Sequence, residues 1–253
     1  MMQTAMTFQT SVKIAITMGC MTQKIFKMVQ VTIVTKMVYL TNANLTAAIL
    51  SSADLSGAVL RAATLTKADI SLADLSNSDL SNATLTGAII TDAIMTRCLL
   101  SNADLTKSDL TGTDLTNAVA KKTILTSAIL NETDCTGADF SSADLVNASI
   151  RDAVVTGALL GSAKIINAKL EGSVFTGANL TGADLTGADL TGVDLTSALL
   201  SSADLTRSIL INANLTEALM TSTKLVGVTW QNTTCPDGSK SSDHGDTCEE
   251  NLL

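Results

Sequence analysis

A large apolar residue returns at every fifth position along most of this chain. In the stretch TGANLTGADLTGADLTGVDLTSALL these residues are Leu180, Leu185, Leu190, Leu195 and Leu200. An α-helix returns a side chain to one face every 3.6 residues and a strand every 2, so neither places every fifth residue on one side. The chain must therefore turn once per repeat for each leucine to point into a common interior. Such turns wind the chain into coils that stack through backbone hydrogen bonds at about 4.8 Å.

The repeat keeps one phase from Leu40 to Trp230, with Ala120 and Cys135 as the main interruptions of the large apolar position. The residue two places earlier is small, the next is often Asp or Asn, and Thr or Ser follows the leucine. The unit therefore reads A-(D/N)-L-(T/S)-x. Glycine is frequent at the last position, where a tight turn requires positive φ. Aromatic residues make up only 2% of the chain, and we expect an interior of Leu, Ile and Ala that is too narrow for a ring.

These units resemble the pentapeptide repeat family. Clear copies are Ala53-Asp54-Leu55-Ser56-Gly57, Ala103-Asp104-Leu105-Thr106 and Ala183-Asp184-Leu185-Thr186-Gly187. The resemblance implies an all-β fold, a right-handed quadrilateral β-helix with four repeats per coil, in a rod roughly 45 Å long. We expect three regions: an N-terminal extension or cap over 1–39, the solenoid over 40–230, and a polar C-terminal cap over 231–253.

Charge and motifs exclude several classes of function. The net charge of −8 divides into +4 over residues 1–39, −8 over 40–230 and −4 over 231–253, which argues against direct binding to nucleic acid. No apolar run is long enough for a transmembrane segment. The sole histidine, His244, lies in the tail, and no phosphate-binding or dinucleotide-binding motif occurs. We expect a protein that is not an enzyme and that needs no cofactor and no metal.

One face of the predicted solenoid is apolar. Positions twenty apart stack if four repeats close a coil, and the residue before each leucine points outward. One such row carries seven apolar residues among ten, namely Tyr39, Val59, Leu99, Val119, Leu159, Leu199 and Leu219. A long exposed apolar row marks interfaces, so we predict that it binds a protein partner or a second copy of the chain. The alternative is that such residues merely suit strands. The aspartates on the other sides are expected to cap turns.

The C-terminal tail carries the signals of a cap. Trp230 is too large for the interior and is expected to lie over the end of the array. Cys235 and Cys248 bracket a polar loop and are expected to form a disulfide, which would contribute roughly 3 kcal/mol; two free thiols are the alternative. The tail also resembles tails that close some bacterial pentapeptide arrays. The spacing of Asp237, Asp243 and Asp246 is not that of a calcium-binding loop. The spacing of Cys235, His244 and Cys248 is not that of a zinc site.

The sequence signals for the compartment are divided between export and the cytoplasm. A structural disulfide favours an oxidising compartment, such as the periplasm or a thylakoid-lumen-like space. The run SVKIAITMGC ends at Gly19-Cys20 like a lipoprotein cleavage site, but Lys13 and Thr17 do not suit a secretory signal. Cys98 and Cys135 fall at inward positions and are expected to be inert core thiols.

Two functions remain. The first is a non-catalytic structural or protein-interaction solenoid that self-associates through the apolar face. The second follows from the family resemblance, because some pentapeptide repeat proteins are similar to duplex DNA in width and charge and bind DNA gyrase or topoisomerase. Those proteins carry a dimerising C-terminal helix and often a loop within the array, and this sequence has neither feature. A third reading, an antifreeze surface suggested by regular Thr ladders, lacks a flat T-x-T array.

Overall fold

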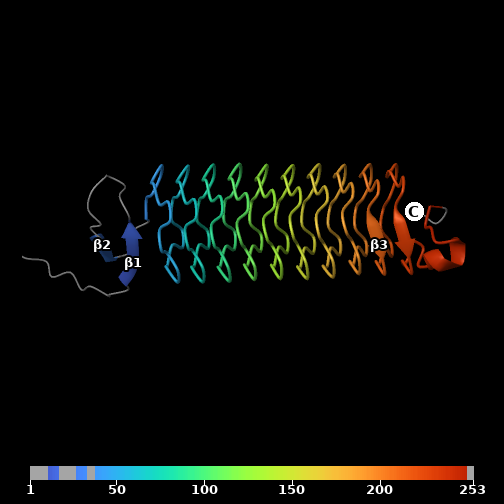
Figure 1. Cartoon of the computed structure of the whole chain (residues 1–253), viewed down its shortest axis with the longest axis horizontal. Helices are drawn as coiled ribbons and strands as arrows, with labels where there is room; N and C mark the ends of the chain where they lie inside the picture. The colour runs from blue at the N-terminus through green and yellow to red at the C-terminus, as the bar shows by residue number, and fades with distance from the viewer. Residues whose placement is uncertain (1–10, 17–26, 33–37, 250–253) are drawn as a thin grey trace, which may run out of the picture.

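The array is a rod of stacked coils (Figure 1). The structure is a computed structural model that describes residues 11–16, 27–32 and 38–249. Along the rod, each outward residue forms a parallel bridge with the residue twenty positions later, from Tyr39 with Val59 to Asn214 with Thr234. Four repeats therefore close one coil, as the sequence predicts. The parallel stacking reaches one repeat beyond Trp230.

Regular strands are short because a two-residue turn follows each extended segment of three residues. Strand β3 (Ile209–Ile211) pairs in parallel with β4 (Thr229–Gln231), and a 3-10 helix, η1 (Ser241–His244), follows in the tail. Strands β1 (Ser11–Ile16) and β2 (Lys27–Thr32) pair antiparallel, with Ser11 opposite Thr32. The remainder of the predicted N-terminal extension, residues 1–10, 17–26 and 33–37, lies outside the described residues.

Each turn places its second residue in the left-handed region. Every fifth residue from Asn42 to Asn232 has φ between +50° and +74°, whether or not it is glycine. Gly57 has φ +64°, as its position predicts, but Leu72 has φ +57°. The backbone N–H three residues after each leucine closes the turn, as from Ala58 to the Leu55 carbonyl at 3.0 Å. The tertiary stacking therefore imposes a conformation that most side chains disfavour.

Hydrogen bonds along the rod axis join each repeat to the coils on either side. Leu60 N–H donates to the Asp79 carbonyl at 2.7 Å, and Asp79 N–H donates to the Ala58 carbonyl at 2.9 Å. A third bond joins the turns, from Ala62 N–H to the Ser81 carbonyl at 3.0 Å. Repetition of this pattern satisfies the buried backbone of the array.

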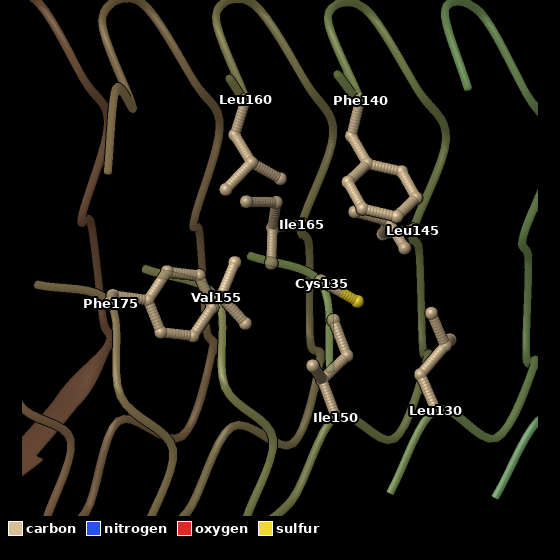
Figure 2. Close-up of a pocket in the computed structure, with 9 residues that line it drawn as sticks. All are labelled: Leu130, Cys135, Phe140, Leu145, Ile150, Val155, Leu160, Ile165 and Phe175. Atoms are coloured by element: carbon tan, nitrogen blue, oxygen red, sulfur yellow. The ribbon is translucent and has the colours of Figure 1, made fainter. Parts of the chain in front are cut away.

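The interior holds columns of leucine and alanine that are almost completely buried. The expectation that no aromatic ring fits is wrong at two positions, since Phe140 and Phe175 are also buried (Figure 2). Smaller residues make the room: Ala120 lies one coil before Phe140, and Val155 and Cys135 precede Phe175 in its column. The mixture leaves a cavity of about 10 Å³ with an entirely apolar lining, which offers a water molecule no polar partner.

Candidate interaction face

The predicted apolar residues do lie in one row. We call the row of outward residues from Tyr39 to Leu219, in steps of twenty, the apolar face. Its side chains at positions 39, 99, 159 and 219 are exposed, and those at positions 59, 119 and 199 are half-buried. Leu159 leaves 42% of its surface exposed. Because apolar neighbours stack in successive coils, as Leu99 does with Val119, the face presents continuous apolar segments.

Three polar residues interrupt the row, and each has a partner. Asp79 pairs with Arg61 at 3.7 Å, and Asp139 pairs with Lys121 at 3.1 Å. Asn179 accepts a hydrogen bond from Thr181 N–H at 3.0 Å. Partial burial raises the pKa of Asp139, but hydrogen bonds from Ser141 and Lys121 outweigh it and hold the pKa below its ordinary value. Each of the two acids of the face therefore has a neighbouring cation as its partner.

The apolar face differs from the rest of the rod in net charge. The face and the two rows of turns that flank it hold three acids against four bases, a net charge of +1. The remainder of residues 40–230 holds 16 acids against 7 bases, a net charge of −9. The charged residues on the face and in its flanking turns are Arg61, Asp79, Arg97, Lys121, Lys122, Asp139 and Glu217. The acids are most concentrated on the row that contains Asp54, Asp74, Asp114, Asp134 and Asp194, whereas the apolar face with its flanking turns is close to neutral.

Other exposed apolar residues are more dispersed. On the face of Ile49, isoleucine alternates with aspartate through Asp69, Ile89 and Asp109. Ile124, which is 42% exposed, lies on another face between Asp104 and Asp144. These isolated side chains are ordinary for a soluble surface, so the apolar face is the principal candidate for recognition.

The aspartates of the repeat act in turns. The carboxylate of Asp109, for example, accepts hydrogen bonds from Thr111 N–H at 3.0 Å and from the Thr111 hydroxyl at 2.7 Å. The same arrangement recurs at many repeats, as between Asp189 and Thr191. The side chain thus satisfies the first N–H of the turn, as predicted, and these carboxylates are committed to structure.

The tail folds back onto the last repeat and caps it. Ser241 N–H donates to the Thr233 carbonyl at 2.9 Å, and the Lys240 ammonium donates to the Thr234 hydroxyl at 2.8 Å. Cys235 and Cys248 form the predicted disulfide, with their Cα atoms 5.4 Å apart. The two sulfurs are bonded to each other, so neither is available as a zinc ligand. The cap satisfies backbone groups that an open end would expose.

Trp230 keeps its place in the core row. It lies opposite Leu210 in the β3–β4 pair and is only 7% exposed. This corrects the expectation that an indole cannot occupy the large apolar position. Trp230, Cys235 and Cys248 are all buried members of the core cluster, which continues from the last coils into the tail.

The remaining chemistry-bearing residues are separated or buried. Burial raises the pKa of both Cys98 and Cys135 to about 12, so their thiols are protonated and inert. Within residues 38–249 and the two described strands, no three His, Cys, Asp or Glu side chains are grouped so as to hold a metal ion. Over the same ranges there is no helix with the length and apolar character needed to cross a membrane.

A family profile described as pentapeptide repeats, counted as eight copies, matches residues 39–77, 78–117, 123–157, 158–196 and 198–229. The chain belongs to the pentapeptide repeat family. The predicted fold is thereby confirmed: this pentapeptide repeat protein is an all-β, right-handed quadrilateral β-helix. Its described residues supply the expected geometry of four repeats per coil.

Solved pentapeptide repeat proteins are similar to this one. HetL, from the cyanobacterium Nostoc sp. and involved in heterocyst differentiation regulation, is 32% identical over 78% of this chain and 91% of its own, with a TM-score of 0.35. A trypsin-treated QnrB1, a plasmid-mediated fluoroquinolone resistance protein, is 19% identical over 63% of this chain and 89% of its own, with a TM-score of 0.54. The second likeness shows the fold alone. No curated protein matches the sequence.

Proposed function

We propose that this pentapeptide repeat protein is a non-catalytic interaction rod whose apolar face binds a second copy of the chain. The observation that carries the proposal is the row of ten outward residues, seven of them apolar, in which apolar residues stack in segments of up to two coils on a rod with a net negative charge. Exposed apolar rows of this extent favour an interface. A scaffold role fits a family whose members are generally structural or interaction proteins.

Charge favours a second copy as the occupant. Outside the apolar face and its flanking turns the array carries a net charge of −9, most concentrated on the row that contains Asp54, so two rods repel each other when these acidic rows meet. The apolar face is the exception, because its own acids are paired with Arg61 and Lys121. Two copies can therefore approach closely with these faces together, whereas a cationic partner or a basic peptide would be drawn to the acidic row that contains Asp54.

The committed carboxylates support a role without catalysis. The repeat aspartates lie on the convex outside of the rod and accept hydrogen bonds from turn N–H groups, as Asp109 does from Thr111. A catalytic acid or base needs a proton that it can exchange with a bound substrate, and an aspartate fixed in a turn is poorly suited to that task. The acidic surface likewise supports the absence of direct binding to nucleic acid.

The test is the mass of the chain in solution. Wild type is expected to be a dimer at about twice the 26.1 kDa of one chain, measured by light scattering over a wide range of concentration. Leu159→Asp combined with Val119→Asp is expected to give monomers, because each substitution places a carboxylate in the apolar contact. Aspartate is native to this position of the repeat, as at Asp139, so the variant retains the fold.

Ile124→Asp is the matched control. Ile124 and Leu159 are both 42% exposed and both lie between polar residues of the adjacent coils, but Ile124 is on a different face. We expect this variant to remain dimeric. A wild-type chain that is monomeric at every concentration, or a double variant that dimerises as wild type does, overturns the proposal.

The second candidate, a DNA-mimicking binder of DNA gyrase or topoisomerase, is favoured by the net charge of −9 that the array carries outside the apolar face and its flanking turns. A gyrase supercoiling assay with a quinolone separates the two functions. Inhibition or protection at micromolar protein supports the mimic. An unaffected enzyme beside an intact dimer rejects it.

A further inference from the structure

We infer that the two copies pair antiparallel, with a two-fold axis that crosses the apolar face midway between Val119 and Asp139. The inference rests on the proposed function and specifies the partner's orientation. It follows from the order of apolar and polar residues along the face.

The face reads almost the same in both directions. Rotation about the stated axis brings each outward residue opposite the one equally far on the other side of the centre. Four of the five distinct pairings then match in polarity: Tyr39 with Leu219, Val59 with Leu199, Leu99 with Leu159, and Asp79 with Asn179. Three of these bury apolar against apolar surface, and the fourth brings a carboxylate to a neutral amide.

The one mismatch lies at the centre and is already compensated. There Val119 faces Asp139 of the second copy. Asp139 is 3.1 Å from the Lys121 ammonium in its own chain, and only 15% of its side chain is exposed. Lys121 follows Val119 by two residues, so in the pair it also lies near Asp139 of the other copy. Two lysines and two aspartates thus form a neutral central cluster, which avoids an unpaired buried charge.

Other pairings are less complementary. In a parallel two-fold pair every outward residue faces itself, which places Asp79 against Asp79 and Asp139 against Asp139. Like charges directly opposite are destabilising. Moving the antiparallel axis by half a coil rise to Val119 brings Asp79 opposite Leu159 and Asp139 opposite Leu99. Moving it to Asp139 sets that carboxylate against itself. The central axis is the arrangement that avoids these contacts.

Pulsed electron paramagnetic resonance tests the orientation. A nitroxide is attached to Leu219→Cys in a Cys20→Ser background. Cys98 and Cys135 are buried with pKa values of about 12, and Cys235 and Cys248 are bonded, so the introduced thiol alone is labelled. Nine coil rises separate Leu219 from Tyr39, so antiparallel copies place the two labels about 43 Å apart. Parallel copies place them side by side.

Disulfide trapping gives a second measurement that does not depend on the label. Leu99→Cys and Leu159→Cys are made in separate chains and mixed under oxidation. We expect a cross-linked dimer from the mixture and little from either chain alone, because like positions are three coil rises, about 14 Å, apart.

The outcomes separate the two proposals. A dimer with a short label distance, or with self-linking single-cysteine chains, overturns the antiparallel pairing and leaves the interaction face. A wild-type chain that stays monomeric by light scattering overturns the proposed function and the pairing with it. A dimer with the long distance and mixed cross-links supports both.

Discussion

At the scale of single residues, the array needs glycine in only a few turns. The second residue of each turn has positive φ, yet at many turns this residue is Asn, Ser, Lys or Ala. Gly187 is different, because a Cβ there would lie 2.4 Å from the Asn167 side-chain oxygen in the preceding coil. Gly177 has φ +64° and nothing within 4 Å of that position. Glycine thus serves conformation at one turn and both conformation and space at the other.

Replacement of these two glycines separates the effects. Gly177→Ala is expected to cost about 1 kcal/mol of unfolding free energy, because alanine disfavours positive φ. Gly187→Ala is expected to cost more, since Asn167 must also move. Urea denaturation measures both, and adding Asn167→Ala to Gly187→Ala should remove the excess. Equal costs for the two glycines would contradict the steric argument.

The pair between Asp204 and Lys224 gives acid-dependent stability. Hydrogen bonds from Thr206 and from the Lys224 ammonium, 2.9 Å away, lower the pKa of Asp204 from 3.8 to about 2. A carboxyl whose pKa is lower in the folded state stabilises the fold above its unfolded pKa. That contribution is lost as the pH falls from about 4 to about 2.

Asp204→Asn should therefore be less stable than wild type at pH 7, and the difference should shrink across that acid range. Asparagine retains an oxygen for the Thr206 N–H, as Asn214 does for Thr216, so the substitution removes mainly the charge. The effect is expected to be small because the pair is solvent-exposed. Thermal denaturation at several pH values measures it, and a difference that is independent of pH contradicts the assignment.

At the scale of elements, the C-terminal cap depends on its disulfide. The bond between Cys235 and Cys248 holds the tail across the last repeat, over the core cluster that contains Trp230. Reduction removes a constraint of up to about 3 kcal/mol. We expect the tail to loosen locally while the coils of the array remain folded.

Trp230 reports this change because it is the only tryptophan of the chain. Its emission is expected to shift to longer wavelength on reduction, as water reaches a ring that is 7% exposed in the oxidised protein. Cys235→Ser with Cys248→Ser should show the shifted emission without reductant and should not respond to it. An emission maximum that is the same in all three samples would mean that hydrogen bonds such as Ser241 to Thr233 hold the cap alone.

At the scale of the whole molecule, the sequence predicts most of the architecture because the period is strict. Five residues per side and twenty per coil determine which side chains share a face, so the sequence alone predicts which residues form the apolar row. The buried Phe140 could not be predicted from local pattern, because the space for it comes from Ala120 one coil earlier. The positive φ of Leu72 could not be predicted either, because the stacking of coils overrides the backbone preference of leucine.

What covers the apolar face also lies beyond the pattern of one chain. The period places Leu159 and Ile124 at equivalent outward positions, and both are equally exposed. Only their neighbours distinguish them. Leu159 lies between Asn179 and Asp139, and the latter is paired with Lys121. Ile124 lies between two aspartates, Asp104 and Asp144. The difference is a property of the assembled surface and of its total charge.

The direction of the ladder bonds has a mechanical consequence. The chain runs around the rod, so bonds such as Leu125 N–H to the Asp144 carbonyl point along the axis. Tension between the two ends loads these bonds coil after coil in series, and the weakest coil would peel away first, releasing about 65 Å of extended chain for each twenty residues. Compression instead presses close-packed leucines together. The rod is therefore expected to resist compression along its axis and to unfold coil by coil under tension.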